Sequence, residues 1–501
     1  MLEEDGAMDA DHLVGEEPGS PPQPRGGEGA LAATVLEPVR WVRMLCRELG
    51  GTFVAGVVLV YGLSQGFAGS FFRVASDYYW KDVQRVQPAT VQFLSVFFYV
   101  PWVLKPLWGV MTDVFPVHGY RRRPYFLFSA TIVAMATGLP VSSAVLCFVG
   151  ISTAVAIADV TIDACIAKNS IDKPALAPDM QSLCAFSSSL GALIGYATSG
   201  MFVHHLGAQG ALGVMAIPPA TVVFLGFFIY ELKTYHHNNV KEKVLNKVSG
   251  AVKGMVRTIK YPVVWKPSLY MFLSLALSIS THEGQFYWYT SKTPPNPGFS
   301  QEFVGLVHAI GAVASMVGVL IYHKCLKNYP FRSILFYAQL LYGVSGLLDL
   351  TFVLRWNLAL GVPDAVFVTL EECVSRVVGR VRLMPMMVLS TKLCPPGVEG
   401  TFFALLMCID SLGMLTAKAG GAAVLRALHV TRTDFGHLWL AVLLRNVLRL
   451  ATLGAIFLVP TADQTDVLVP RELLTSSPAA VADDEEERLQ LAMLTSHTDD
   501  V

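Results

Sequence analysis

Residues 91–111 read VQFLSVFFYVPWVLKPLWGVM, a run in which Lys105 is the only charged side chain. A helix of about 20 mostly apolar residues is needed to cross the hydrocarbon core of a bilayer. The run has that length and that character, so it predicts a membrane-spanning helix. Arg121, Arg122 and Arg123 follow it after a short turn, and such basic residues are typical of a cytoplasmic loop.

The composition of the whole chain also indicates a membrane protein. Of its 501 residues 53% are hydrophobic and 15% are charged, whereas soluble domains carry roughly 25% charged residues. The net charge of −1 argues against a nucleic-acid-binding protein, which would show a basic surface. The eight cysteines are scattered and none has C-x-x-C spacing, so we expect neither a disulfide framework nor a zinc site.

Apolar runs of spanning length follow one another through most of the chain, and we count about twelve. We therefore expect an all-α membrane protein with twelve transmembrane helices in two six-helix halves, which is the plan of the major facilitator fold. The tenth and twelfth runs are the least clear because each carries several arginines. The runs cover residues 51–72, 91–111, 124–141, 144–167, 182–203, 211–230, 268–288, 303–322, 334–354, 364–389, 401–425 and 437–459.

The segments outside the two halves differ in composition. The acidic tails are predicted to be disordered, and neither resembles a signal or transit peptide. The central loop is basic and has an amphipathic pattern, so it is either an interfacial helix or a solvated linker. The five predicted regions are the N-terminal tail 1–40, the first half 41–231, the loop 232–267, the second half 268–460 and the C-terminal tail 461–501.

Lys and Arg set the predicted orientation. With both termini in the cytosol, about twenty basic residues fall on inner connections and about seven on outer ones. The sequence does not indicate which cellular membrane holds the protein.

The second run ends in GVMTDVFPVHGYRRRP, residues 109–124, which resembles the facilitator signature G-x-x-x-D-R/K-x-G-R/K-R/K. We interpret five residues as a gate, in which a glycine permits close helix contact and basic residues pair with an acid. This copy departs from the pattern because FPVH separates the acid from the next glycine. Alternatively, the arginines only anchor the loop on the cytoplasmic side. The gating residues are Gly109, Asp113, Arg121, Arg122 and Arg123.

Several longer motifs resemble the folate-biopterin transporter family of the major facilitator superfamily. They include SDYYWKDVQRVQPA at 76–89, AIADVTIDACIAKNS at 156–170, HEGQFYWYT at 282–290 and LCPPGVEGTFFALLMCIDSLG at 393–413. The similarity extends from about residue 42 to residue 460. It implies a twelve-helix carrier of folates and pterins in which spans 1, 4, 7 and 10 border a central cavity.

Asp159 and Asp163 lie four residues apart in the fourth run, so they share one helix face. Two close carboxylates in a medium of low dielectric constant do not both ionise cheaply, which makes the pair a candidate proton site. A carboxylate also suits the 2-amino and N–H edge of a pterin. The alternative is a buried ion pair with a basic residue of another span.

In the tenth run Glu372, Arg376 and Arg380 step by four along one face. Arginine binds carboxylates in bidentate fashion, so we expect Arg376 and Arg380 to hold the glutamate end of a folate. Alternatively, Glu372 and Arg376 form an internal pair and Arg380 anchors at the cytoplasmic surface. Arg382 we interpret as an anchor at the cytoplasmic surface.

Further candidates rest on the rarity of charge inside a membrane. His282 and Glu283 in the seventh run form a candidate proton relay or part of an external vestibule. Gln65 in the first run is a candidate uncharged donor in the cavity. Asp410 and Lys418 share a face of the eleventh run and could pair with each other or with the gate.

These features predict a secondary active transporter of folates or pterins that works by alternating access, with proton coupling left open. The alternatives are a facilitator for another small organic anion or solute, and less favourably a membrane enzyme or a scaffold. An enzyme of the prenyltransferase type needs two acidic motifs on facing helices, and the predicted spans contain a single D-x-x-x-D. We expect no enzymatic activity and no cofactor or metal. The expected partners are the small-molecule substrate, protons and the bilayer.

Overall fold

The computed structural model describes residues 39–108, 140–172, 176–215, 218, 260–326, 328–393 and 399–462. The chain divides into two compact units, residues 1–54 and 55–501. In the first unit, residues 39–49 are helical. Within the described residues the secondary structure is entirely helical, as predicted.

The N-terminal part of the chain forms one long segmented span and three further helices. The first span consists of α2 (Gly51–Val57), the π-helical η1 (Val58–Ala68), α3 (Gly69–Tyr78) and the π-helical η2 (Tyr79–Val83). The helices that follow are α4 (Pro88–Val103), α7 (Val141–Asp172) and α8 (Ala177–Val214).

The C-terminal part contributes the remaining helices. They are α11 (Pro262–Ala276), α12 (His282–Tyr289), α13 (Gln301–Ile321), η5 (Tyr322–Leu326), α14 (Phe331–Val353), α15 (Trp356–Ala359), α16 (Asp364–Lys392), α17 (Glu399–Ala427), α18 (Leu438–Ala451) and η6 (Thr452–Leu458).

In the described part of the chain, seven helical segments are long and apolar enough to cross a membrane. They coincide with the predicted runs 1, 2, 4, 8, 9, 11 and 12. Runs 5, 7 and 10 are also helical, as α8, as α11 with α12, and as α16. Run 3, most of run 6, both tails and most of the basic loop lie outside the described residues. The seven segments are Gly51–Val83, Pro88–Trp108, Val141–Val160, Gln301–Leu326, Phe331–Val353, Leu405–Ala427 and Leu438–Leu458.

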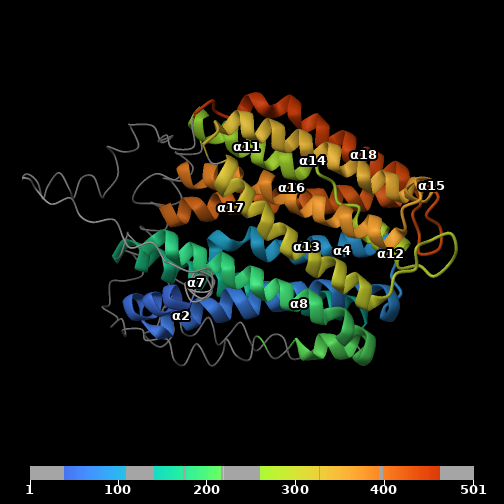
Figure 1. Cartoon of the computed structure of the whole chain (residues 1–501), viewed down its shortest axis with the longest axis horizontal. Coiled ribbons are helices and arrows are strands. Elements are labelled where there is room, and N and C mark those ends of the chain that lie inside the picture. Colours follow the sequence, from blue (N-terminus) through green and yellow to red (C-terminus); the bar gives the residue numbers. More distant parts are fainter. Residues whose placement is uncertain are drawn as a thin grey trace, which may run out of the picture. The chain divides into compact units, whose positions relative to one another are not determined.

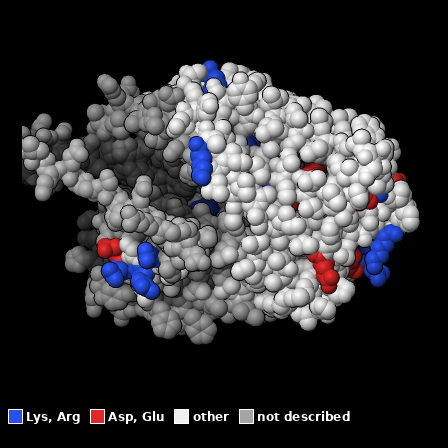
Figure 2. Space-filling view, in the orientation of Figure 1, with Lys and Arg blue, Asp and Glu red and all other residues white. Residues whose placement is uncertain are grey.

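The outward-facing surfaces of these helices are apolar. On the face shown in Figure 2, most of the described surface carries neither basic nor acidic side chains. Such a surface would be unusual in water but suits contact with lipid. Exposed apolar residues on two of the helices are Leu306, Val313, Val317 and Leu320 of α13, and Leu341, Val344 and Leu347 of α14.

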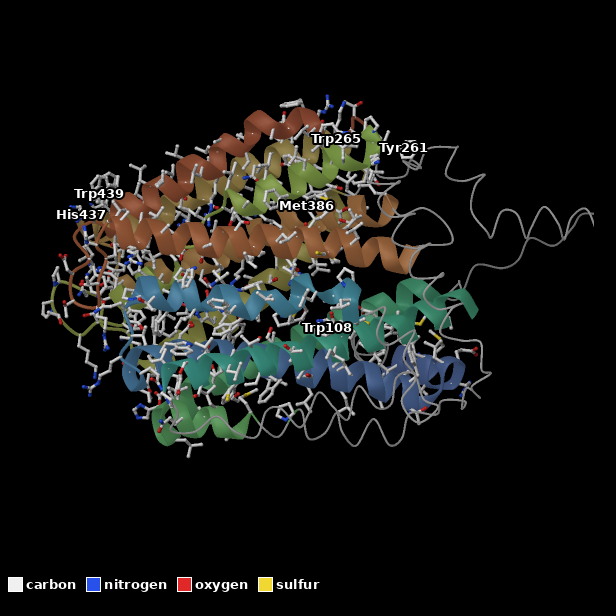
Figure 3. The ribbon with its side chains drawn as sticks, turned by 180° about the vertical axis from the view of Figure 1, so that it is seen from behind. Trp108, Tyr261, Trp265, Met386, His437 and Trp439 are labelled. Carbon is white, nitrogen blue, oxygen red and sulfur yellow. The ribbon has the colours of Figure 1, made fainter. Side chains whose placement is uncertain are left out.

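Helices from the two parts of the chain pack against one another. α13 lies beside α8, and α17 lies beside α4 (Figure 1). α11 and α18 begin at opposite ends of the helices: Tyr261 and Trp265 lie at one end, and His437 and Trp439 lie at the other (Figure 3). Aromatic residues at both ends are typical of the membrane interfaces.

The predicted seventh span is broken in its middle. α11 ends at Ala276, and five residues without regular α-helix precede α12. The backbone N–H of Ser280 donates to the carbonyl of Ala417 in α17 at 3.0 Å. A Cβ at Gly421 would lie 1.8 Å from the carbonyl oxygen of Ser280, so α17 can approach the break only because it carries glycine there. Non-helical backbone at membrane depth is tolerated where protein surrounds it or where it borders a cavity.

Glycines also bring η1 into close contact with α8. A Cβ at Gly191 of α8 would lie 2.0 Å from the carbonyl oxygen of Gly62, and one at Gly66 would lie 2.4 Å from that of Ser188. Small residues at such positions allow helix backbones to approach each other in a membrane. This contact fixes the position of η1, which carries Gln65.

Replacing Gly191 with alanine is therefore expected to destabilise the protein. The added methyl group overpacks the contact with η1, which typically costs about 1–3 kcal/mol. The measurement is the free energy of unfolding of the purified protein in detergent, with the midpoint of thermal unfolding as a second readout.

Gly213→Ala, in the part of α8 that follows the kink at Gly207, is the control, because a Cβ at Gly213 meets nothing within 4 Å. We expect it to be neutral or to stabilise the helix by up to about 1 kcal/mol. Equal effects of the two substitutions would contradict the close packing of η1 against α8.

Candidate functional site

A cavity of about 1100 Å³ lies among the helices of residues 55–501. It is lined by η1, α3, η2, α4, α7 and α8 from the N-terminal part and by α11–α14 and α16–α18 from the C-terminal part. Its volume is near the upper end of the range for small-molecule sites, roughly 300–1,000 Å³. The cavity is therefore large enough for a substrate that contacts both parts of the chain.

The lining is rich in ionisable side chains, although most of the surrounding helix surface is apolar. Such groups are costly inside a membrane and generally mark a functional site. The basic residues in the lining are Arg73, Arg376, Arg382, Lys418, Arg445 and Arg449, and the acidic ones are Asp77, Glu283, Asp349, Glu371, Glu372 and Asp410.

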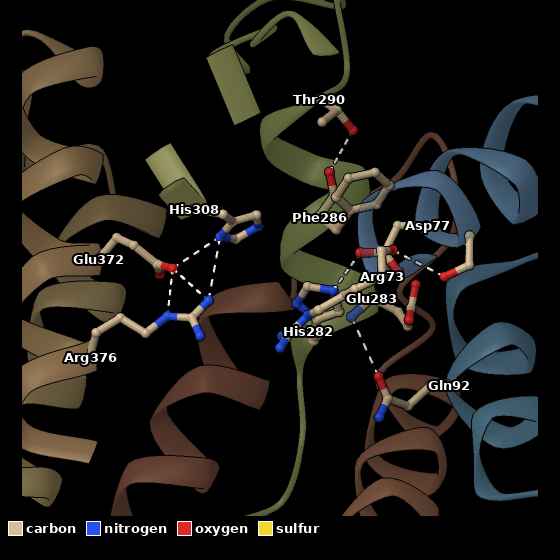
Figure 4. Close-up of polar contacts among 11 residues, drawn as sticks. Arg73, Asp77, Gln92, His282, Glu283, Phe286, Thr290, His308, Glu372 and Arg376 are labelled. Atoms are coloured by element: carbon tan, nitrogen blue, oxygen red, sulfur yellow. Dashed lines mark hydrogen bonds and ion pairs between the residues drawn. The ribbon is translucent and has the colours of Figure 1, made fainter. Parts of the chain in front are cut away.

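The helix break in the seventh span places His282 and Glu283 beside α3 (Figure 4). Nε2 of His282 lies 2.9 Å from Oδ2 of Asp77. Glu283 is 3% exposed, and its backbone N–H donates to Oε1 of Gln92 in α4 at 3.4 Å. One carboxylate oxygen of Glu283 has no hydrogen-bond partner among the described residues. The three ionisable groups therefore form a buried cluster that connects the two parts of the chain.

This cluster could share a proton or hold a metal ion. Ligand atoms of Asp77, His282 and Glu283 lie within 4.8 Å of one another. The side chains of Arg73 and Lys418 interact electrostatically with the same three groups. Because these two positive charges oppose a further cation, we interpret the cluster as a proton-sharing site.

Arg73 lies one turn before Asp77 in α3 and borders the cavity. Its side chain is accessible from the cavity, although it lies deep among the helices. Among the described residues, its guanidinium makes neither a hydrogen bond nor an ion pair. It is thus available to a negatively charged group of a substrate.

A second cluster joins α13 and α16 (Figure 4). Oε1 of Glu372 lies 2.9 Å from Nδ1 of His308 and accepts a hydrogen bond from Nε of Arg376 at 2.7 Å. Arg376 also lies over the ring of Tyr196 in α8, with its Cζ atom 5.9 Å from the ring centroid. Glu372 and Arg376 therefore form the predicted internal pair while both line the cavity.

Arg380 and Arg382, which follow in α16, have different surroundings. Nε of Arg380 donates to Oγ of Ser315 in α13 at 3.0 Å, and Arg380 is not part of the cavity lining. Arg382 is 7% exposed and donates to Oγ of Ser274 at 2.8 Å. The interpretation of Arg382 as a surface anchor is therefore wrong, because its side chain lines the cavity.

Asp159 and Asp163 both accept hydrogen bonds from neighbouring helices. Asp159 accepts from the side chains of Gln65 and Lys105, and Asp163 accepts from the hydroxyl of Tyr61. Asp159 is 4% exposed, and neither aspartate belongs to the cavity lining, whereas Gln65 does. The geometry of Asp159 is that of the alternative prediction, a buried ion pair with a basic residue of another span.

A third cluster holds the second part of the chain together beside the cavity. Arg445 of α18 forms an ion pair with Asp349 of α14. It also donates to Oγ1 of Thr281 at 2.9 Å and to Oε1 of Gln285 at 3.0 Å. Arg445 thereby fixes the end of the helix break to two other helices.

The sequence reasoning missed several of the lining residues. Five of them are ionisable residues inside predicted spans, and this signal alone would have been sufficient to select them, whereas Arg73 and Asp77 lie beyond the predicted end of the first run at residue 72. The missed residues are Arg73, Asp77, His308, Asp349, Glu371, Arg445 and Arg449. The predicted gating residues Gly109, Asp113, Arg121, Arg122 and Arg123 lie outside the described part of the chain.

Comparison with known proteins gives a consistent result. Residues 65–477 match the family model described as the BT1 family. The chain is 58% identical over 453 residues to "Probable folate-biopterin transporter 6" of Arabidopsis thaliana, covering 89% of this chain and 90% of that protein. It is 46% identical to "Probable folate-biopterin transporter 2" of the same plant, with 94% and 96% coverage.

Solved structures show the same fold at low sequence identity. The crystal structure of the nucleoside transporter NupG matches with a TM-score of 0.61 and 13% identity, covering 80% of this chain and 98% of that one. The helices of this chain therefore adopt a fold known from membrane transporters.

The ion pair of Lys105 with Asp159 is expected to be structural. Lys105→Met would leave a buried carboxylate without its cation, and loss of one partner of a buried pair typically costs about 3–5 kcal/mol. Removing both charges in Lys105→Met/Asp159→Asn is expected to recover most of that loss. Thermal and denaturant unfolding of the purified single and double variants measures the coupling.

The ion pair of Arg355 with Asp364, whose side chains are 23% and 20% exposed, is the comparison cycle. Because it is more accessible to solvent, we expect its coupling to be smaller, at most about 1 kcal/mol. If the losses of the two Lys105–Asp159 single variants simply added in the double variant, the pair would have no structural role.

Proposed function

This chain belongs to the BT1 family, and from that premise we propose that it carries folates or pterins across a membrane. The observation that supports this cargo is the composition of the cavity, which presents carboxylates and guanidinium groups to one enclosed space. A pterin offers a 2-amino group and ring N–H donors, and a folate adds a glutamate with two carboxylates. The cavity therefore offers a charged partner for each end of a folate.

We propose that unpartnered carboxylates receive the pterin edge. Oε2 of Glu283 and Oδ1 of Asp410 are buried and have no hydrogen-bond partner among the described residues, and both residues line the cavity. A buried acceptor without a partner carries a desolvation cost that a ligand donor can remove. Gln65 and the Glu372–Arg376 pair border the same space and complete the proposed substrate site, whereas His282 is assigned to the proton below.

We further propose that residues 41–231 and 268–460 form two six-helix halves that rock around this cavity. In support, both segments line it, and contacts of α8 with α13 and of α4 with α17 form the boundary between them. In the proposed orientation both termini lie in the cytosol. The end at which α17 turns into α18 then faces away from the cytosol.

We propose that hydrogen bonds joining the two segments close the cavity at this end. Nζ of Lys81 donates to the hydroxyl of Thr290 at 2.6 Å, and the hydroxyl of Tyr287 donates to the carbonyl of Val86 at 3.0 Å. The backbone N–H of Arg432 donates to Oε1 of Gln87 at 3.1 Å. Alternating access requires these bonds to break when the cavity opens on this side.

We also propose that transport is coupled to the movement of protons. The cluster of Asp77, His282 and Glu283 lies between the two segments and next to the cavity. A proton taken up there would change the attraction between Asp77 and His282, and with it the stability of the closed arrangement. Such a group can couple a proton gradient to the movement of substrate.

Uptake into proteoliposomes tests this function. We expect saturable uptake of labelled folic acid or biopterin by the purified protein, stimulated by a pH gradient that is acid outside. His282→Gln is expected to lose the stimulation by the gradient but to keep exchange of labelled for unlabelled substrate, because exchange needs no net proton movement.

His437→Gln is the control for this variant, because His437 is exposed at the end of α18 and does not line the cavity. Absence of uptake of both compounds by the folded wild-type protein would contradict the cargo and would favour a carrier of another organic anion. If uptake by the wild-type protein did not depend on the pH gradient, the proton coupling would be contradicted but the cargo would not.

A further inference from the structure

Three arginines gather where α16 and α18 border the cavity. Arg382, Arg445 and Arg449 are 7%, 5% and 9% exposed, and all three belong to the cavity lining. Arginine is rare inside membrane spans because its charge is costly to remove from water. Each of these arginines therefore calls for a partner.

Arg445 has such a partner, but the other two do not. Arg445 forms its ion pair with Asp349, which also accepts from Gln285 at 2.9 Å. Among the described residues, neither Arg382 nor Arg449 forms an ion pair, and the Nε atom of each has no hydrogen-bond partner. Two buried cations thus lack a negative counterpart.

A tyrosine ring lies against both unpaired cations. The Cζ atoms of Arg382 and Arg449 lie 4.4 Å and 4.1 Å from the centroid of the Tyr342 ring. Cation–π contact offsets only part of the cost of burying a guanidinium. It does hold the two planar groups close to one another, so that both can act on one ligand.

The neighbouring acids do not neutralise this pair. Asp410 of α17 interacts electrostatically with Arg382, but no ion pair joins them in the described structure. Asp349 is held by Arg445. Ser274, the hydrogen-bonding partner of Arg382, is uncharged. The missing negative charge can therefore come from a molecule in the cavity.

We propose that Arg382 and Arg449, held by Tyr342, form a carboxylate-binding subsite of the cavity. This inference rests on the proposed function and specifies it: the subsite takes the dicarboxylate end of a folate, while an uncharged pterin leaves it unused. Planar guanidinium groups suit this task because they bind carboxylates in bidentate fashion. Substrates with a glutamate end should accordingly bind more tightly than the pterin alone.

This assignment differs from the sequence-based one, which placed Arg376 and Arg380 at the carboxylate. Arg376 is paired with Glu372, and Arg380 contacts Ser315 outside the cavity lining. Replacing Arg449 therefore distinguishes the two assignments.

The experiment measures binding to the purified full-length protein by calorimetry. The probes are folic acid, biopterin and N-acetylglutamate, which carries the dicarboxylate without the pterin. Arg449→Gln and Arg382→Gln are each expected to weaken the binding of folic acid and of N-acetylglutamate about tenfold or more. This is the usual effect of losing a charge-assisted hydrogen bond. The affinity for biopterin should stay within about twofold of the wild-type value, because biopterin makes no charge-assisted hydrogen bond at the subsite.

Two further variants keep the test decisive. Arg449→Lys preserves the charge but not the planar fork, so it should fall between the wild-type protein and Arg449→Gln. It also replaces Arg449→Gln if that variant fails to fold. Arg426→Gln is the control, because Arg426 lies exposed in the last turn of α17 and outside the cavity lining.

Equal weakening of biopterin and folic acid would show that the arginines only support the structure, and unchanged binding of both would exclude the subsite. If the wild-type protein bound neither folic acid nor biopterin, the proposed cargo would be wrong. Binding of N-acetylglutamate would still test whether the carboxylate subsite exists. Its binding by the wild-type protein and its loss in Arg449→Gln would support a carboxylate site for another anion. If the wild-type protein did not bind N-acetylglutamate either, the inferred subsite would be wrong.

Discussion

An ionised side chain inside a bilayer must find an opposite charge, a hydrogen bond or water, because hydrocarbon offers none of them. The described helices show opposite charges and hydrogen bonds in this role. Lys105 neutralises Asp159, and Arg445 neutralises Asp349. The groups that remain without such a partner line the cavity, among them Arg73 and Arg449. The cavity therefore lies where charged side chains of the helices have no partner. The apolar outer surface follows from the same constraint, because it faces the hydrocarbon.

The helical class and most spans could be predicted from the sequence, because span length and hydrophobicity are properties of local segments. The family was also readable from motifs such as HEGQFYWYT, since these are contiguous in the chain. The break between α11 and α12 was not predicted, because residues 268–281 carry no charge and contain neither glycine nor proline. At the break, α17 approaches closely at Gly421. The irregular backbone there is a tertiary effect, so no local pattern shows it.

The side chains of the candidate site were predicted less well than the spans, for a geometrical reason. Helical spacing shows which residues share a face, as for Glu372 and Arg376, whose pairing is present. It does not show which helix that face meets. Asp159 pairs with Lys105, and Arg380 donates to Ser315. Arg382, two residues after Arg380, instead lines the cavity. Partners from other spans decide these differences, and they are absent from any single segment.

Three of the hydrogen bonds that join the two segments lie toward the Thr290 end of α12 and use acceptors without charge, unlike the contact of His282 with Asp77. Lys81 donates to Thr290, Tyr287 donates to a carbonyl, and the N–H of Arg432 donates to an amide oxygen. Mobile ions screen attraction between opposite charges, with a Debye length of about 8 Å at physiological ionic strength, but act little on bonds to neutral acceptors. In the proposed orientation, these three bonds would therefore depend little on the salt concentration of the compartment that they face. A transporter built in this way could keep its closed state in compartments whose ionic content changes widely.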